Sequence, residues 1–142
     1  MSSEFLEKYH GVLKGVLRWE KLDELWANIR DHQDDGWFIY APGHEIPEKA
    51  ANGSDVDHFL TRMDSLLREE HKEDYCGIVY TDDFRHPSLV KIFDPNNLGV
   101  SCGSSDKPPL PGWIMSLSKP EEINQEAVIP GNRQRWWAKL WN

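Results

Sequence analysis

The chain has 142 residues and a formal net charge of −8 at pH 7, and this length fits a single domain over residues 1–142 with one core. Residues 20–75 carry fifteen acidic and six basic side chains, a local balance of −9 that repels phosphate backbones, so we expect no nucleic-acid partner. The apolar runs are all shorter than the roughly 18 residues that a membrane-spanning helix needs, which excludes a membrane span.

The first predicted element is a helix over residues 3–18. Its apolar residues recur at helical spacing, and they are Phe5, Tyr9, Val12, Leu13 and Val16. Gly11 and Gly15 each weaken this helix by about 1 kcal/mol relative to alanine. The two glycines would form a stripe of small residues, which we expect to serve close packing within the fold rather than a dimer seam.

Two further helices are predicted from stronger patterns. Residues 21–32 place four apolar side chains on one face of an amphipathic helix, and these are Leu22, Leu25, Trp26 and Ile29. Residues 54–71 place a longer apolar series on one face, made of Val56, Phe59, Leu60, Met63, Leu66 and Leu67. Ser54 and Asp57 resemble a capping box at the start of this helix, whereas His58 and Asp64 fall on its expected solvent face.

Strands account for much of the remaining chain. Residues 37–41 are a short aromatic run that predicts a buried strand. Residues 75–83 and 88–94 are rich in β-branched and aromatic side chains and predict a hairpin, and residues 112–118 alternate as in a half-buried strand. Because these strands follow one another without intervening helices, we expect an α+β fold. It would be a small, mostly antiparallel sheet of about three to five strands with about three helices packed on one face.

Residues 94–112 form a long connection without periodicity. Loops longer than ~12–15 residues with no structure of their own are usually functional or disordered. Asn96, Asn97 and Gly99 favour turns near the start, and the proline-rich end favours stiff, extended geometry. We therefore expect an ordered loop that packs against the body of the protein and forms its functional surface.

Three interpretations of this loop remain open. The first is an anion-binding nest of backbone N–H groups and hydroxyls, with ligand-binding residues Asn96, Asn97, Gly99, Ser101, Gly103, Ser104 and Ser105. The second is a catalytic thiol at Cys102 with His86 as its base, or in its place His44 or His58, which requires a lowered pKa of the thiol. In the third, which we favour, Cys102 is a small apolar side chain and the glycines serve the backbone.

The C-terminal residues 133–142 form a basic, aromatic stretch without an acidic side chain and are a candidate docking tail. Tryptophan and arginine are enriched at interface hot spots, so the expected interface residues are Arg135, Trp136, Trp137 and Trp141. In the alternative, which we favour, the tail folds back and its indoles complete the core.

Other side chains suggest little specific chemistry. The six histidines lack the spacing of metal ligands, so we expect no metal and no cofactor. Asp82 and Asp83 are adjacent acids after a strand, which we interpret as solvated turn residues rather than an acid–base pair. The start MSSEFLEKYH lacks the pattern of an export signal, so we expect a cytoplasmic protein in which Cys76 and Cys102 are reduced.

The leading function hypothesis is a small cytoplasmic binding or accessory protein that acts through protein–protein contact, with a partner protein or by self-association. Its functional surface would be the loop over residues 94–112. The alternatives are a cysteine-dependent enzyme with thiol or acyl-transfer chemistry at Cys102, and a small-anion sensor that uses the Gly/Ser loop.

Overall fold

The computed structural model of this protein describes residues 4–95, 110–123 and 131–141. In these residues the elements follow one another as α1 (Glu4–Tyr9), β1 (Lys14–Val16), α2 (Trp19–Arg30), β2 (Phe38–Tyr40), α3 (Gly53–Glu70), β3 (Val79–Thr81), β4 (Leu89–Ile92), β5 (Trp113–Ser116) and α4 (Gly131–Leu140). No helix in these ranges combines the length and the apolar character needed to cross a bilayer.

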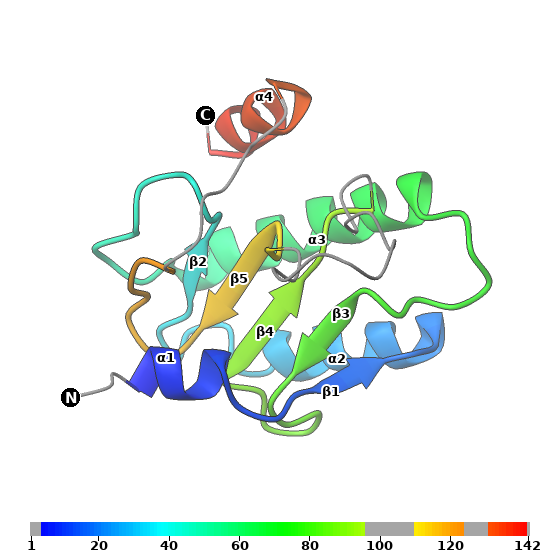
Figure 1. The fold of residues 1–142 in the computed structure, drawn as a ribbon, viewed down its shortest axis with the longest axis horizontal. Coiled ribbons are helices and arrows are strands. Elements are labelled where there is room, and N and C mark those ends of the chain that lie inside the picture. The colour runs from blue at the N-terminus through cyan, green and yellow to red at the C-terminus, as the bar shows by residue number, and fades with distance from the viewer. Residues whose placement is uncertain (1–3, 96–109, 124–130, 142) are drawn as a thin grey trace, which may run out of the picture.

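The five strands form one antiparallel sheet in the order β1-β3-β4-β5-β2. Helices α2 and α3 cover one face of this sheet and the short helix α1 lies on the other (Figure 1). We call these the inner and the outer face. The α+β fold predicted from the sequence, with its small antiparallel sheet, is confirmed.

The inner face carries the main core. Every residue of the apolar stripes predicted for the helices now labelled α2 and α3 is buried. These stripes pack against inward-facing strand residues, which are Ile39, Val79, Val90, Ile92, Trp113 and Met115. Burying a side chain of leucine size contributes about 1.5–3 kcal/mol, so this layer contact is the main source of stability.

Helix α4 lies along α3 in the opposite direction and is the third helix on this side. Arg133, near the start of α4, donates hydrogen bonds to Glu70 at the end of α3. Near the end of α4, the carbonyl of Leu140 accepts a hydrogen bond from His58 Nε2 at 3.1 Å. His58, expected on the solvent face of α3, therefore contacts another helix.

The outer face carries a second, smaller apolar cluster. Phe5 and Tyr9 of α1 are buried against Leu89, Ile114 and Tyr40 of the sheet. Because successive strand residues point to opposite faces, these three lie on the side away from α2 and α3. The sheet is thus covered on both faces, but α1 has only six residues and spans only part of the outer face.

The helix predicted over residues 3–18 is wrong beyond Tyr9. The helix ends there, and residues 14–16 form the edge strand β1, paired with β3. Val12, expected in the apolar stripe, is 94% exposed. Glycine raises the cost of a helix interior, so Gly11 and Gly15 let the chain leave the helix, and pairing with β3 makes residues 14–16 a strand.

Two details of α3 also differ from expectation. The helix begins at Gly53, and its cap is Asn52, whose side chain accepts a hydrogen bond from the Asp55 backbone N–H at 2.8 Å. The capping box predicted at Ser54 is therefore wrong by two residues. Asp64, predicted to be solvated, accepts a hydrogen bond from Trp26 Nε1 at 3.0 Å and thus joins α3 to α2.

Candidate functional site

A row of side chains crosses the outer face of the sheet. Strand register pairs Gly15 with Tyr80, Tyr80 with Lys91, Lys91 with Ile114, and Ile114 with Tyr40. Helix α1 covers the end of this row at Ile114 and Tyr40. The other end, over β3 and β4, is not covered by any element of the described residues.

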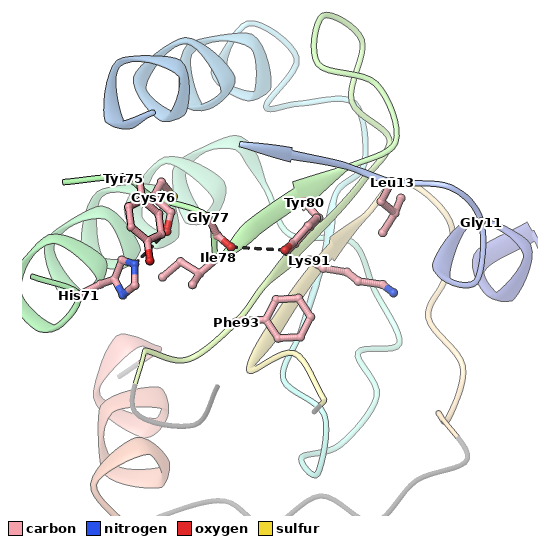
Figure 2. A pocket seen from close by; sticks show the side chains of 10 residues that line it. All are labelled: Gly11, Leu13, His71, Tyr75, Cys76, Gly77, Ile78, Tyr80, Lys91 and Phe93. Carbon is pink, nitrogen blue, oxygen red and sulfur yellow. Dashed lines mark hydrogen bonds between the residues drawn. The ribbon is translucent and has the colours of Figure 1, made fainter. Parts of the chain in front are cut away.

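This open end forms a pocket of about 550 Å³, a size typical of small-molecule sites. Tyr80 and Lys91 rise into it from β3 and β4, with Phe93 just beyond β4 (Figure 2). Leu13 lines one side, and the far end lies near Tyr75. The walls are therefore largely aromatic and aliphatic, with one cationic side chain among them.

Lys91 is the unusual group of this pocket. Its Nζ lies 3.7 Å from the centroid of the Tyr9 ring, a cation–π contact. Burial raises the pKa of Tyr9 to about 12, and nearby Tyr40 adds to the rise, so Tyr9 is a neutral phenol. Within the described ranges, no carboxylate pairs with the Lys91 ammonium and no hydrogen bond reaches it.

The environment of Lys91 disfavours its charge. The side chain is half-buried, and this burial lowers the pKa of its ammonium group. A bound anion would offset the lost hydration and restore the pKa. The pocket thus combines apolar walls with a cation that lacks an anionic partner in the described part of the chain.

Tyr80 is held in place by both neighbouring strands. Its ring lies over Gly15 of β1, where a Cβ would approach the Tyr80 Cε1 to 3.1 Å. Its hydroxyl donates to the carbonyl of Gly77 at 3.4 Å, and its ring meets Phe93 edge-to-face with centroids 5.6 Å apart. Gly15 therefore provides space for this wall of the pocket, a close packing within the fold.

At the far end of the pocket, the side chains of His71 and Cys76 serve the fold: the first is hydrogen-bonded to the backbone and the second is buried. His71 caps the C-terminus of α3, and its Nε2–H donates to the carbonyl of Cys76 at 2.8 Å. Cys76 is a free, fully buried cysteine, and burial raises the pKa of its thiol. A nucleophilic cysteine requires the thiolate, so Cys76 is a structural residue.

The adjacent acids Asp82 and Asp83 organise the turn between β3 and β4. Asp82 accepts hydrogen bonds from the backbone N–H groups of Ser88 and Leu89, at 2.9 and 3.0 Å, and from the Ser88 hydroxyl. Asp83 accepts from the backbone of residues 85 and 86. These bonds agree with the interpretation as turn residues, although Asp82 is partly buried rather than solvated.

The predicted loop site falls almost wholly outside the described residues. This holds for Cys102 and for the ligand-binding set Asn96, Asn97, Gly99, Ser101, Gly103, Ser104 and Ser105. The predicted base, His86, is exposed in the turn before β4, whereas Pro95 and Gly112, which flank the loop, lie near the far end of that strand. The catalytic and anion-binding interpretations stay predictions.

The C-terminal residues 133–141 form most of α4 and contact the body of the protein. Trp136 meets Trp113 edge-to-face at 5.4 Å, and Trp137 and Trp141 both contact the ring of Phe59. Trp136 and Trp137 are partly buried, whereas Trp141 and Arg135 are exposed. The packing matches the alternative in which the indoles complete the core, and a docking role for the exposed residues stays a prediction.

Among residues 4–95, 110–123 and 131–141, no group of three or more His, Cys, Asp or Glu side chains is arranged to hold a metal ion. Comparison of the chain with protein-family models, with curated proteins and with solved structures found no match. The geometry of the described residues is therefore the basis for assigning a function.

Reasoning from the sequence missed the pocket and its lysine. The sequence predicts the strand over residues 88–94, and in it Lys91 stands between Val90 and Ile92. Period-two alternation assigns such a lysine to a solvated face. The sequence does show a lysine in an otherwise apolar strand. It does not show that α1 partly covers the outer face of the sheet, on which Lys91 lies.

Proposed function

We propose that this protein is a small cytoplasmic binding or accessory protein that acts through contact with a partner protein, and that its outer-face pocket receives an acidic, aromatic group. The polar groups at the far end of the pocket are occupied within the fold, His71 with a carbonyl and Cys76 by burial. This supports holding a ligand rather than converting one. A reduced Cys76 fits the cytoplasm.

The observation that carries this proposal is the environment of Lys91. An ammonium group taken partly out of water loses hydration, and a partner of opposite charge recovers more of this loss than an aromatic ring does. In the described structure the partner is only the face of the Tyr9 ring. A carboxylate, phosphate or sulfonate of a ligand would complete the environment of this cation.

The remainder of the ligand is defined by the walls. Tyr80 and Phe93 present ring surfaces at one side of Lys91, and Leu13 adds aliphatic surface. Aromatic ligands gain both apolar burial and edge-to-face contacts with such rings. We therefore assign the pocket to a flat aromatic group that carries a nearby anion.

The test is a matched series of three probes: 2-naphthoate, 2-naphthylmethanol and 2-naphthylmethylammonium. These share the ring system and differ in charge, and binding is measured by titration calorimetry at pH 7. The carboxylate should bind about tenfold more tightly than the alcohol, since one charge-assisted contact contributes about 1.5 kcal/mol. The ammonium probe should bind more weakly than either.

The Lys91→Met variant keeps the aliphatic stem and removes the charge. It should abolish the preference for the carboxylate and leave the affinity for the alcohol nearly unchanged. Lys119→Met, at an exposed lysine after β5, is the matched control and should behave like the wild type. Equal affinity of the wild type for carboxylate and alcohol, or full carboxylate binding by Lys91→Met, would reject the proposal.

A further inference from the structure

The edge of the sheet at β1 is a second surface that no strand of the described residues covers. β1 is the terminal strand and pairs only with β3 among the described residues. In Figure 1 it lies at the rim of the sheet, opposite the β2 edge. Edge strands expose unpaired backbone N–H and C=O groups, which natural proteins normally protect.

Exposed apolar side chains gather at this edge. Val12 and Leu17 flank β1 and are 94% and 66% exposed. Tyr75, 57% exposed, lies near Leu17 on the β3 side of β1, where the backbone N–H of Cys76 donates to the carbonyl of Leu17, and it also lines the pocket. These are three of the four large hydrophobic residues that are exposed in the described part of the chain. Such clustering is typical of an interaction surface.

The charge of this edge is opposite to that of the rest of the chain. Residues 8–18 contain Lys8, Lys14 and Arg18 and no acidic side chain, whereas the whole chain carries −8. Lys8 pairs with Glu4. Lys14 and Arg18 are exposed, and neither forms an ion pair within the described residues, although Lys14 is close enough to Asp83 to add to the backbone hydrogen bonds that lower the pKa of that carboxyl.

A lysine on an edge strand can also serve to prevent aggregation. That role would account for Lys14. It does not account for Val12 and Leu17, whose exposed apolar surface promotes association at the same edge. Basic and apolar side chains together on an open edge instead match the requirements of an extended, acidic and apolar segment. Strand addition of this kind takes its affinity from main-chain hydrogen bonds and its specificity from alternate side chains.

We propose that β1 binds an extended acidic segment of a partner protein, which adds to the sheet as a further strand beside β1. Acidic side chains of that segment meet Lys14 and Arg18, its alternate apolar side chains cover Leu17, and its end reaches Val12, which precedes β1. A second copy of this chain is a poorer occupant, since pairing two β1 strands would bring like charges together. The inference shares with the proposed function only the partner protein and does not depend on the pocket.

The probe is an acetylated octapeptide of alternating valine and glutamate, with the valine–lysine octapeptide as the control ligand. Binding is followed by amide chemical shifts of the full chain in low salt. The acidic peptide should shift the amides of residues 12–17 in a saturable way, and moderate salt should weaken the binding. Shifts elsewhere, no saturable shifts, or equal binding of the lysine peptide would overturn the proposal.

Two charge-reversal variants test the residues. Lys14→Glu combined with Arg18→Glu should weaken peptide binding about tenfold, as expected for two partly screened ion pairs. Lys49→Glu combined with Lys119→Glu makes the same change in net charge at exposed lysines outside this edge and should have little effect. Equal weakening by both pairs would show that net charge alone drives binding and would reject the site.

A third variant guards against misfolding and self-association. Val12→Asp combined with Leu17→Asp alters two exposed positions, and circular dichroism checks that the fold is kept. This variant should also lose the peptide. A wild-type dimer in sedimentation that this variant dissociates would identify a second copy as the occupant and overturn the proposal. Lys91→Met should keep the peptide, so failure at the edge and failure at the pocket are distinguishable.

Discussion

Arg133 and Lys91 are both drawn out of water, but their environments are opposite. Arg133, with a side chain only 8% exposed, donates two hydrogen bonds to Asp94 and two to Glu70. Lys91, on the other side of the sheet, has one aromatic ring and no carboxylate within the described residues. A cation with complete partners serves the fold, whereas one without them is available to a ligand.

The difference also appears in the direction of the pKa shifts. Both cations lose hydration by burial, but the hydrogen bonds and charges of Asp94 and Glu70 outweigh this loss and raise the pKa of Arg133. At Lys91 burial acts alone and lowers the pKa. The loss of hydration is thus offset by carboxylates at Arg133, whereas no carboxylate of the described residues offsets it at Lys91.

The largest expected effect on the free energy of unfolding comes from breaking the ion cluster of Arg133, Asp94 and Glu70. Arg133→Met would leave Asp94, 7% exposed, and Glu70 without their shared cation. Removing one partner of a buried ion pair typically costs 3–5 kcal/mol, and because Glu70 is partly exposed we expect about 3 kcal/mol of unfolding free energy to be lost. Urea denaturation at pH 7 measures this change.

Arg135→Met is the matched control for that prediction. Arg135 lies one half-turn away on the same helix but is exposed. Its loss should change the unfolding free energy by less than about 0.5 kcal/mol. If both variants are equally mild, then the ion pairs of Arg133 contribute little to stability, and the contrast between Arg133 and Lys91 loses its basis.

An intermediate effect is expected at Asp82, a carboxylate satisfied by backbone rather than by a cation. Asp82→Ala leaves the N–H groups of Ser88 and Leu89 without their acceptor, at a cost of about 1.5 kcal/mol. Those hydrogen bonds, opposed by partial burial, lower the pKa of Asp82. Its contribution is therefore complete above the unfolded pKa and is lost as pH falls through the lower folded pKa.

Thermal or urea unfolding at several values between pH 7 and pH 3 checks this dependence. The gap in stability between the wild type and Asp82→Ala should be constant near neutrality and should narrow in acid. A gap that stays constant down to pH 3 would show that the charge of Asp82 does not matter to the turn.

The predictable part of this fold is the part set by local patterns. The stripes of α2 and α3 follow from periodicity, because each buries one face against the sheet. The strands β4 and β5 follow from β-branched and aromatic content and from alternation, but the expected half-burial of β5 is wrong, because α1 covers Ile114 on the outer face and all four residues of β5 are buried. The segment of β1 is predicted as helix, since Val12, Leu13 and Val16 also fit helical spacing. Only pairing with β3, more than sixty residues later, selects the strand.

The candidate sites depend on still more distant contacts. Arg133 meets acids 63 and 39 residues earlier in the chain, and no local pattern predicts such a cluster. Lys91 approaches Tyr9 only because α1 folds onto the outer face. The residue types were visible in the sequence, but their partners were set by the arrangement of the layers.

Among the three groups compared, Arg133, Asp82 and Lys91, the smallest effect on stability is expected at Lys91. Lys91→Met removes a poorly hydrated charge and also the contact with Tyr9, so the unfolding free energy at pH 7 should stay within about 1 kcal/mol of the wild type, with any change towards higher stability. Because the folded pKa is lowered, the cost of the charge is complete below that pKa. It is relieved as pH rises from the folded to the unfolded pKa, so the wild type should approach Lys91→Met in alkaline solution.

Lys91→Arg separates this charge effect from packing, since its guanidinium stays protonated throughout the alkaline range. The stability difference between Lys91→Arg and Lys91→Met should therefore not vary between neutral and alkaline pH, whereas the difference between wild type and Lys91→Met should shrink. If the wild-type gap is also independent of pH, then Lys91 is well hydrated in the free protein. Lys91 would then contribute no more to the binding of an anion than an ordinary surface lysine does.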